Sequence, residues 1–183
     1  MKKELALHLI TTILLFIPVF LLRFLNLQNL SNNLIFLPYL IGGLIGAVLP
    51  DIDHVIYVYY LKPYELTSQR VMYQAQKGNL TESWNILSNT RSERTNLIFH
   101  SILFQIIFVI LSFLVITSSS SLLGKGLVIA FLLHLLLDEY LDLKTNINLQ
   151  NWFKNIPIQL DQNQLTIYLL TNFAIILIFA FLM

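Results

Sequence analysis

Apolar stretches recur along the chain, and each is close to the length that a helix needs to cross a membrane. A hydrocarbon core of about 30 Å takes roughly 20 apolar residues in a helix. Five stretches approach this length, and the second of them is short and ends at Pro50. They cover residues 5–25, 34–49, 97–117, 122–141 and 165–183. The pattern predicts an all-α polytopic membrane helical bundle, a single domain with about five transmembrane helices.

The charges between these stretches predict the orientation of the bundle. Residues 62–95 and 142–164 are long connections, the first a polar loop and the second an interfacial segment that contains Trp152. With the N-terminus in the cytoplasm, nine of the 11 Lys and Arg residues lie inside, and only Arg23 and Lys125 lie outside. Because cytoplasmic segments are enriched in Lys and Arg, we expect an N-in, C-out protein of the cytoplasmic (inner) membrane, surrounded by lipids.

The composition narrows the class of protein further. Hydrophobic residues make up 56% of the chain and charged residues 11%, whereas soluble domains carry about a quarter charged residues. A net charge of +1 provides no basic surface for nucleic acid, so no nucleic-acid partner is expected. The absence of cysteine excludes disulfides, thiolate metal sites and a cysteine nucleophile.

Ionisable residues interrupt the apolar stretches, and such residues usually mark a functional interior. Each histidine lies near the predicted cytoplasmic end of a different helix. On a helix, Asp51 shares a face with His54, and His134 shares one with Asp138. Imidazole and carboxylate are ligands for Zn²⁺, Mn²⁺ and Fe²⁺, and facing helices can place them together in a bundle. The four histidines are His8, His54, His100 and His134.

We therefore predict a metal centre at the cytoplasmic end of the bundle. The expected ion is Zn²⁺, with Mn²⁺ or Fe²⁺ as alternatives. Because the candidate ligands outnumber those of one tetrahedral zinc, the centre has room for one or two ions. The candidate ligands are His8, Asp51, Asp53, His54, His100, His134 and Asp138.

The order of these motifs resembles the inner-membrane, predicted metal-dependent hydrolase family, small proteins of four or five helices. Its members carry a His near the N-terminus, then L-P-D-x-D-H, H-R-G-x-T-H-S and H-x-x-x-D-x-x-T. Residues 49–54 read L-P-D-I-D-H and match the second motif throughout. The other matches are His8, His100-Ser101, and His134 with Asp138.

Two positions depart from the family pattern. Glu93-Arg94 is the nearest counterpart of the leading His-Arg pair, but it lies farther from His100 than the family spacing. Leu141 stands where the family has Thr. One ligand or acid/base group of the family is therefore lost, or replaced by Glu93.

These observations predict metal-dependent hydrolysis of an ester or phosphoester at the cytoplasmic membrane interface. Water activated by the metal would attack the ester, with Asp53 or Glu93 as general base. Arg94 would bind a phosphate or carboxylate through its fork of donors. The depth of the site favours a lipid or another amphipathic substrate.

Two other functions use the same residues. A metal transporter or sensor would share the ligands, although the outer ends of the helices lack polar residues to continue a pathway. In a structural membrane protein, the His and Asp side chains would form hydrogen bonds and ion pairs with one another, without a metal.

Motifs of other membrane enzymes are missing. The sequence contains neither G-x-S-x-G nor H-E-x-x-H, and Val128 stands where a phosphatidic-acid phosphatase would have Arg.

Overall fold

Helices form all the regular structure in the part of the chain that the structure describes. The structure is a computed structural model and describes residues 2–25, 36–144, 151–154, 156 and 160–183. No strand occurs within these ranges, so the all-α prediction is confirmed. The elements are α1 (Lys2–Leu25), α2 (Leu37–Gly46), η2 (Leu49–Asp51), α3 (Ile52–Ile56), η3 (Tyr57–Leu61), α4 (Leu66–Gln76), α5 (Leu80–Asn89), η4 (Arg91–Glu93), α6 (Ile102–Ser118), α7 (Leu122–Lys144) and α8 (Gln162–Leu182).

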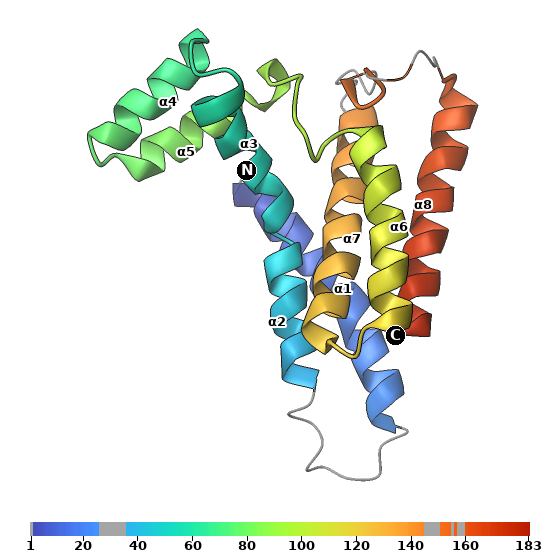
Figure 1. Cartoon of the computed structure of the whole chain (residues 1–183). Helices are drawn as coiled ribbons and strands as arrows, with labels where there is room; N and C mark the ends of the chain where they lie inside the picture. The colour runs from blue at the N-terminus through green and yellow to red at the C-terminus, as the bar shows by residue number, and fades with distance from the viewer. Residues whose placement is uncertain (1, 26–35, 145–150, 155, 157–159) are drawn as a thin grey trace.

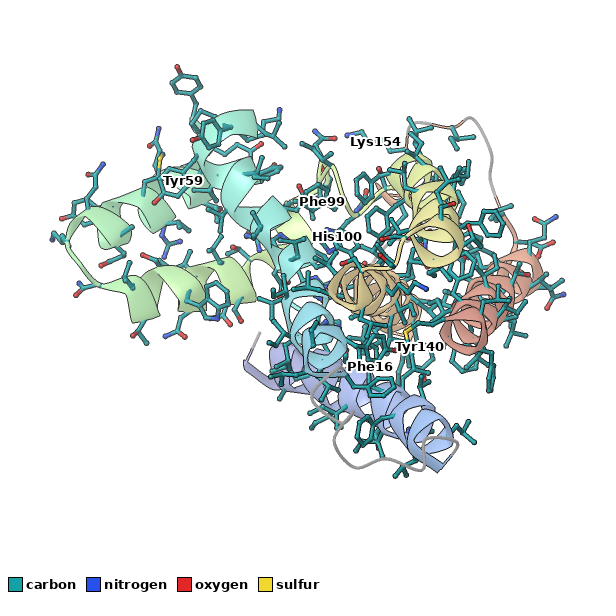
Figure 2. All side chains as sticks on the ribbon, turned by 60° about the horizontal axis from the view of Figure 1, so that its bottom comes forward. Phe16, Tyr59, Phe99, His100, Tyr140 and Lys154 are labelled. Atoms are coloured by element: carbon teal, nitrogen blue, oxygen red, sulfur yellow. The ribbon has the colours of Figure 1, made fainter. Side chains whose placement is uncertain are left out.

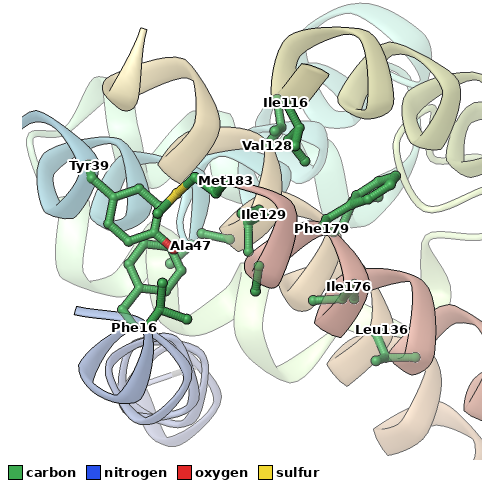
Figure 3. Packing of buried hydrophobic residues seen from close by; sticks show 14 residues of the cluster. Phe16, Tyr39, Ala47, Ile116, Val128, Ile129, Leu136, Ile176, Phe179 and Met183 are labelled. Carbon is green, nitrogen blue, oxygen red and sulfur yellow. The ribbon is translucent and has the colours of Figure 1, made fainter. Parts of the chain in front are cut away.

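Helix α7 is the centre of the bundle, and α1, α2, α6 and α8 all pack against it (Figure 1). Its middle turns are buried on every side, as expected of a helix that is apolar around its whole circumference. Ile129 and Leu132 of α7 belong to the main core with Phe16 of α1, Tyr39 of α2 and Phe179 of α8 (Figure 3). The outward faces of the surrounding helices carry exposed Leu, Ile and Phe, which suits contact with lipid.

Glycines bring α2 and α7 into backbone contact. Gly42 and Gly46 lie four residues apart on α2, the spacing by which small residues let membrane helices approach closely. A Cβ atom on Gly46 would overlap the carbonyl oxygen of Leu127, and one on Gly42 would overlap that of Leu123. From the other side, a Cβ on Gly126 would overlap the carbonyl oxygen of Tyr39. The position of α2 is therefore set by the backbone of α7.

Two helical segments of the described chain are long and apolar enough to cross a membrane, Leu37–Leu61 and Gln162–Leu182. Ala6–Leu22 and Ile102–Ser118 are apolar but shorter. The C-terminus lies at the end of the bundle opposite α4 and α5 (Figure 1). About five spans and the N-in, C-out topology stay predictions.

The prediction that the second helix ends at residue 49 is wrong. Helical structure continues through η2, α3 and the π-helical turn η3 as far as Leu61. Pro50 occupies the first turn of η2, where a missing N–H breaks no intrahelical bond. Asp51, Asp53 and His54 thus lie inside a continuous helical segment.

Residues 62–95, expected as a polar loop, instead contain a helical hairpin. Helices α4 and α5 project to one side of the bundle (Figures 1 and 2). Val71, Ile86 and Leu87 form a small core with Val58 of η3. Gly78 adopts φ 77° between the helices, a left-handed conformation that glycine adopts without strain.

The interfacial position expected for residues 142–164 stays a prediction. Helix α7 runs to Lys144, and 145–150, 155 and 157–159 lie outside the described residues. Trp152 is buried against Ile102, Phe131 and Leu135. Its indole therefore forms part of the wall of the bundle interior.

Candidate metal centre

Four other side chains meet at the carboxylate of Asp138, on α7. It is 1% exposed. His8 Nε2 lies 3.1 Å from Oδ1, and Arg91 Nη2 lies 2.9 Å from the same oxygen. On the other side, Oδ2 is 2.9 Å from His100 Nε2 and 3.2 Å from His134 Nε2. Three imidazoles and one guanidinium therefore surround a single buried carboxylate.

His8, His134 and Asp138 form a buried group that can hold a metal ion. One ligand atom from each lies within 4.8 Å of the others. His134 and Asp138 are one turn apart on α7, which places both on one helix face, and α1 supplies His8. The rings of His8 and His134 stack at 3.8 Å between centroids with 11° between planes. The two imidazoles thus approach Asp138 side by side.

The backbone of α2 determines which nitrogen of His134 carries the proton. Nδ1 lies 2.7 Å from the carbonyl oxygen of Ala47. A carbonyl only accepts, so Nδ1 donates and the neutral ring has a bare lone pair on Nε2. Metal-binding histidines are held in this way, with the other ring nitrogen bonded to a carbonyl or carboxylate.

The resulting contact between His134 and Asp138 fits a cation. His134 Nε2 and His8 Nδ1 are both buried without a hydrogen-bond partner in the described part of the chain. A lone pair that faces a carboxylate oxygen at 3.2 Å joins two acceptors, and such a contact requires positive charge between or beside them. The donor set of two imidazoles and one carboxylate suits a divalent transition metal.

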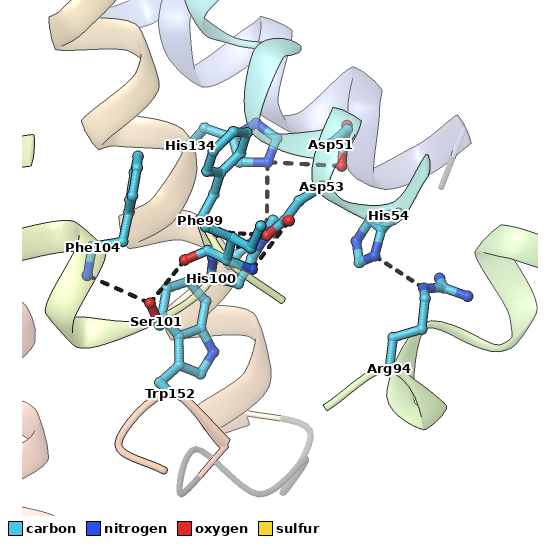
Figure 4. Close-up of polar contacts among 12 residues, drawn as sticks. Asp51, Asp53, His54, Arg94, Phe99, His100, Ser101, Phe104, His134 and Trp152 are labelled. Carbon is cyan, nitrogen blue, oxygen red and sulfur yellow. Dashed lines mark hydrogen bonds and ion pairs between the residues drawn. The ribbon is translucent and has the colours of Figure 1, made fainter. Parts of the chain in front are cut away.

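Asp53, predicted both as a ligand and as the general base, uses its two oxygens to hold the loop before α6. Oδ1 accepts the backbone N–H of Ile98 at 3.1 Å, and Oδ2 accepts those of Phe99 at 2.6 Å and His100 at 3.3 Å. Oδ2 also lies 3.2 Å from His100 Nδ1 (Figure 4). Asp53 thereby directs His100 Nε2 towards Asp138. The same contacts explain why the helix expected from residue 97 begins at Ile102.

His54, predicted as a ligand, pairs with Arg94 instead of entering the group around Asp138 (Figure 4). Its Nδ1 accepts from Arg94 Nε at 3.0 Å. Arg94 also donates to the Thr90 hydroxyl at 3.0 Å and to the Leu87 carbonyl. Burial, and after it the charge of Arg91, lowers the pKa of the Arg94 guanidinium to about 10, so the side chain is charged at neutral pH. Arg94 joins the end of α5 to α3.

Asp51 lies at the edge of the centre and Glu93 lies outside it. Asp51 Oδ1 is 3.8 Å from His134 Nε2, and its side chain is 12% exposed. Glu93 accepts the hydroxyl of Thr67 at 2.5 Å in an exposed position on the hairpin. The structure thus brings together His8, His134 and Asp138, with His100 and Asp51 next to them. The other predicted site residues form contacts outside this group: Asp53, His54, Glu93 and Arg94.

The sequence did not predict the contacts of two further charged residues, the partly buried Arg91 and the buried Glu139. Arg91 contacts Asp138 from η4, and its only signal in the sequence is a spacing of three from Arg94. Glu139 is fully buried between α6, α7 and α8, where it accepts the Tyr168 hydroxyl at 2.6 Å and the Gln105 amide at 3.3 Å. Adjacent carboxylates of α7 therefore serve two separate polar groups, one on each side of the helix.

Comparison with known proteins places this arrangement in a family. The model of the YdjM inner membrane protein family matches residues 6–150, a range that contains His8, the L-P-D-I-D-H segment, His100, His134 and Asp138. No curated protein and no solved structure matches the chain. The match covers well over half of the sequence and agrees with the apolar helices in locating the protein in the inner membrane. The chain belongs to the YdjM inner membrane protein family.

Proposed function

We propose that this protein is a membrane-embedded, metal-dependent hydrolase that cleaves an ester or phosphoester at the cytoplasmic membrane interface. The observation that carries the proposal is the orientation of His134. Its Nδ1 donates to the Ala47 carbonyl, so that the bare Nε2, which has no hydrogen-bond donor, faces Oδ2 of Asp138 at 3.2 Å. His8 Nε2 approaches the same carboxylate at 3.1 Å.

In this proposal His8, His134 and Asp138 hold the ion. Two imidazoles and a carboxylate form a three-ligand set that leaves a coordination position open, which is typical of catalytic zinc; Mn²⁺ and Fe²⁺ accept the same ligands. When bound, such an ion supplies a Lewis acid and lowers the pKa of water to about 7. Asp51 and His100, at the edge of the group, are available as further ligands if two ions bind.

Asp51 is the carboxylate best placed to accept a proton from the attacking water. It lies 3.8 Å from His134 Nε2 and is 12% exposed, so both water and the group around Asp138 are within its reach. Asp53 is less suited because its oxygens already accept three backbone N–H groups. Glu93 is less suited because it bonds to Thr67 on the hairpin.

A second candidate function is a structural membrane protein that needs no metal. One contact favours it: Arg91 Nη2 lies 2.9 Å from Asp138 Oδ1 and supplies positive charge to the carboxylate. The two candidates differ in whether Asp138 carries metal in the purified protein.

Elemental mass spectrometry of the full chain, purified in detergent without chelators or metal resins, distinguishes them. We expect one or two ions per chain in the wild type and none in Asp138→Asn. Glu139→Gln is the matched control, because it changes the adjacent buried carboxylate in the same way but outside the group. Metal-loaded protein is then tested on chromogenic carboxyl esters and phosphoesters. Equal metal content in the wild type and Asp138→Asn would overturn the assignment.

A further inference from the structure

A cavity adjoins the group around Asp138 on the side of the hairpin. Its walls include Arg91 and Arg94 from the base of the hairpin, His100 from the loop before α6, and Asn151 and Trp152 from the segment after α7. Two of these residues also belong to the surroundings of Asp138. Arg91 Nη2 and His100 Nε2 each lie 2.9 Å from that carboxylate. A ligand in the cavity would therefore be separated from Asp138 only by the side chains of Arg91 and His100.

The charge of the cavity favours an anion. Two guanidinium groups line it, against the one carboxylate of Asp142. That carboxylate accepts the Trp152 indole N–H at 2.9 Å and lies 3.8 Å from Arg91 Nη2, so it is already engaged by the walls. A divalent ion at Asp138 would add further positive charge to the same region.

The donors of Arg94 also favour an anion. Three of the five N–H groups of a guanidinium donate here to His54, Thr90 and Leu87. These bonds hold the group rigidly against the wall. In the described part of the chain, the two other N–H groups have no such protein acceptor and can serve a ligand. A guanidinium matches the oxygens of phosphate better than an ammonium because its planar fork binds two of them together.

The size of the cavity limits what can enter. Its volume of about 40 Å³ corresponds to roughly three water molecules. This suits one phosphate group and not a whole lipid, whose remainder would have to lie outside. Ser92, Thr95 and Asn151 also line the cavity, and their side chains are of the kinds that donate hydrogen bonds to phosphate oxygens.

We propose that this cavity binds the phosphate group of a phosphate monoester, with Arg91 as the residue that joins it to Asp138. The inference deepens the proposed hydrolase function and rests on it for the identity of the site, since it selects phosphoesters among the candidate substrates. The phosphate belongs either to a lipid headgroup or to a soluble phosphate monoester, because both present the same group to the two guanidiniums.

Calorimetric titration with inorganic phosphate tests the proposal. The full chain is placed in phosphatidylcholine nanodiscs, and its metal content is measured on the same sample. We expect Arg91→Gln to weaken phosphate binding by about tenfold or more and Arg91→Lys to restore part of the affinity. Arg70→Gln is the matched control, because Arg70 is an exposed arginine of the same hairpin that does not line the cavity. Arg91→Lys also serves as the folded comparison if Arg91→Gln does not fold.

Equal phosphate affinity in the wild type and Arg91→Gln would overturn the proposal, and so would an equal loss in Arg70→Gln. If the protein contains metal but does not bind phosphate, this inference alone is contradicted. If it binds phosphate in an Arg91-dependent way but contains no metal, the hydrolase function alone is contradicted. A second titration with inorganic phosphate, in nanodiscs that contain phosphatidic acid, distinguishes a lipid headgroup from a soluble phosphate monoester as the natural ligand. A lower apparent affinity for phosphate indicates that the lipid headgroup occupies the cavity, and an unchanged affinity indicates a soluble monoester.

Discussion

His134 donates its Nδ1–H to the carbonyl oxygen of Ala47, 2.7 Å away. This bond connects the central helix of the bundle to the end of α2, next to the glycine contact between the two helices. It determines the tautomer of His134 and turns Nε2 towards Asp138. The chemistry of the site therefore depends on how closely two helix backbones approach, as well as on the residues that face it.

The first prediction concerns this approach. Gly46→Ala places a Cβ against the Leu127 carbonyl oxygen, so we expect α2 to move away from α7. The cost should be about 1–3 kcal/mol of stability, and metal affinity should fall because the Ala47 carbonyl moves with α2. Thermal unfolding and metal content measure the two effects. Gly124→Ala is the control, since its Cβ would meet only ordinary contacts at 3.5 Å; equal effects in both variants would contradict the prediction.

The second prediction tests whether Asp53 stabilises the loop before α6 or binds a metal. Asp53→Asn keeps the shape of the side chain but turns an amide towards backbone N–H groups that need an acceptor. We expect a loss of about 2–3 kcal/mol in stability with metal content close to the wild type. Chemical unfolding and elemental mass spectrometry provide the readouts. Loss of metal at unchanged stability would instead make Asp53 a ligand.

The third prediction concerns His54 and Arg94. Because Arg94 Nε donates to His54 Nδ1 at 3.0 Å, the effects of His54→Ala and Arg94→Ala on stability should not add. A double-mutant cycle should give a coupling energy of about 1–2 kcal/mol. Additive effects, or loss of metal in His54→Ala, would show that His54 acts elsewhere.

The fourth prediction uses metal removal. An ion that binds only the folded protein stabilises it by about 2.7 kcal/mol at a free concentration of 100 times its Kd. Chelation should therefore lower the unfolding temperature of the wild type and of Glu139→Gln. It should leave Asp138→Asn unchanged, because that variant lacks the carboxylate on which His8 and His134 converge. A chelator effect of the same size in Asp138→Asn would place the ion at another position.

The fifth prediction tests the topology. The chain contains no cysteine, so a single introduced thiol reports its own location. Ser120 is exposed in the turn between α6 and α7, and Lys77 is exposed at the tip of the hairpin. In the N-in, C-out arrangement, an impermeant thiol reagent should label Ser120→Cys in intact cells and Lys77→Cys only after lysis. The opposite pattern would invert the topology.

Local patterns in the sequence predicted the features that depend on one helix at a time. The long apolar stretches predicted the helices of the bundle, because apolar length is a property of each segment alone. The spacing of four between His134 and Asp138 predicted that both would share a face of α7. For the same reason the sequence could not show that Pro50 is accommodated in a first helical turn, or that residues 62–95 fold into a hairpin around four apolar side chains.

Which polar residues contact one another depends on how the helices pack. His8 reaches Asp138 because α1 packs on α7, and Arg91 reaches it because the chain turns back from the hairpin to the bundle at η4. Asp53 satisfies the loop before α6 because the backbone N–H groups there have no helical partner. Such contacts join backbone groups and side chains that are far apart along the chain, so residue type and local spacing cannot predict them. The sequence alone predicted a helical membrane protein with side chains that can bind a metal, and helix packing determined which of those side chains meet in one buried group.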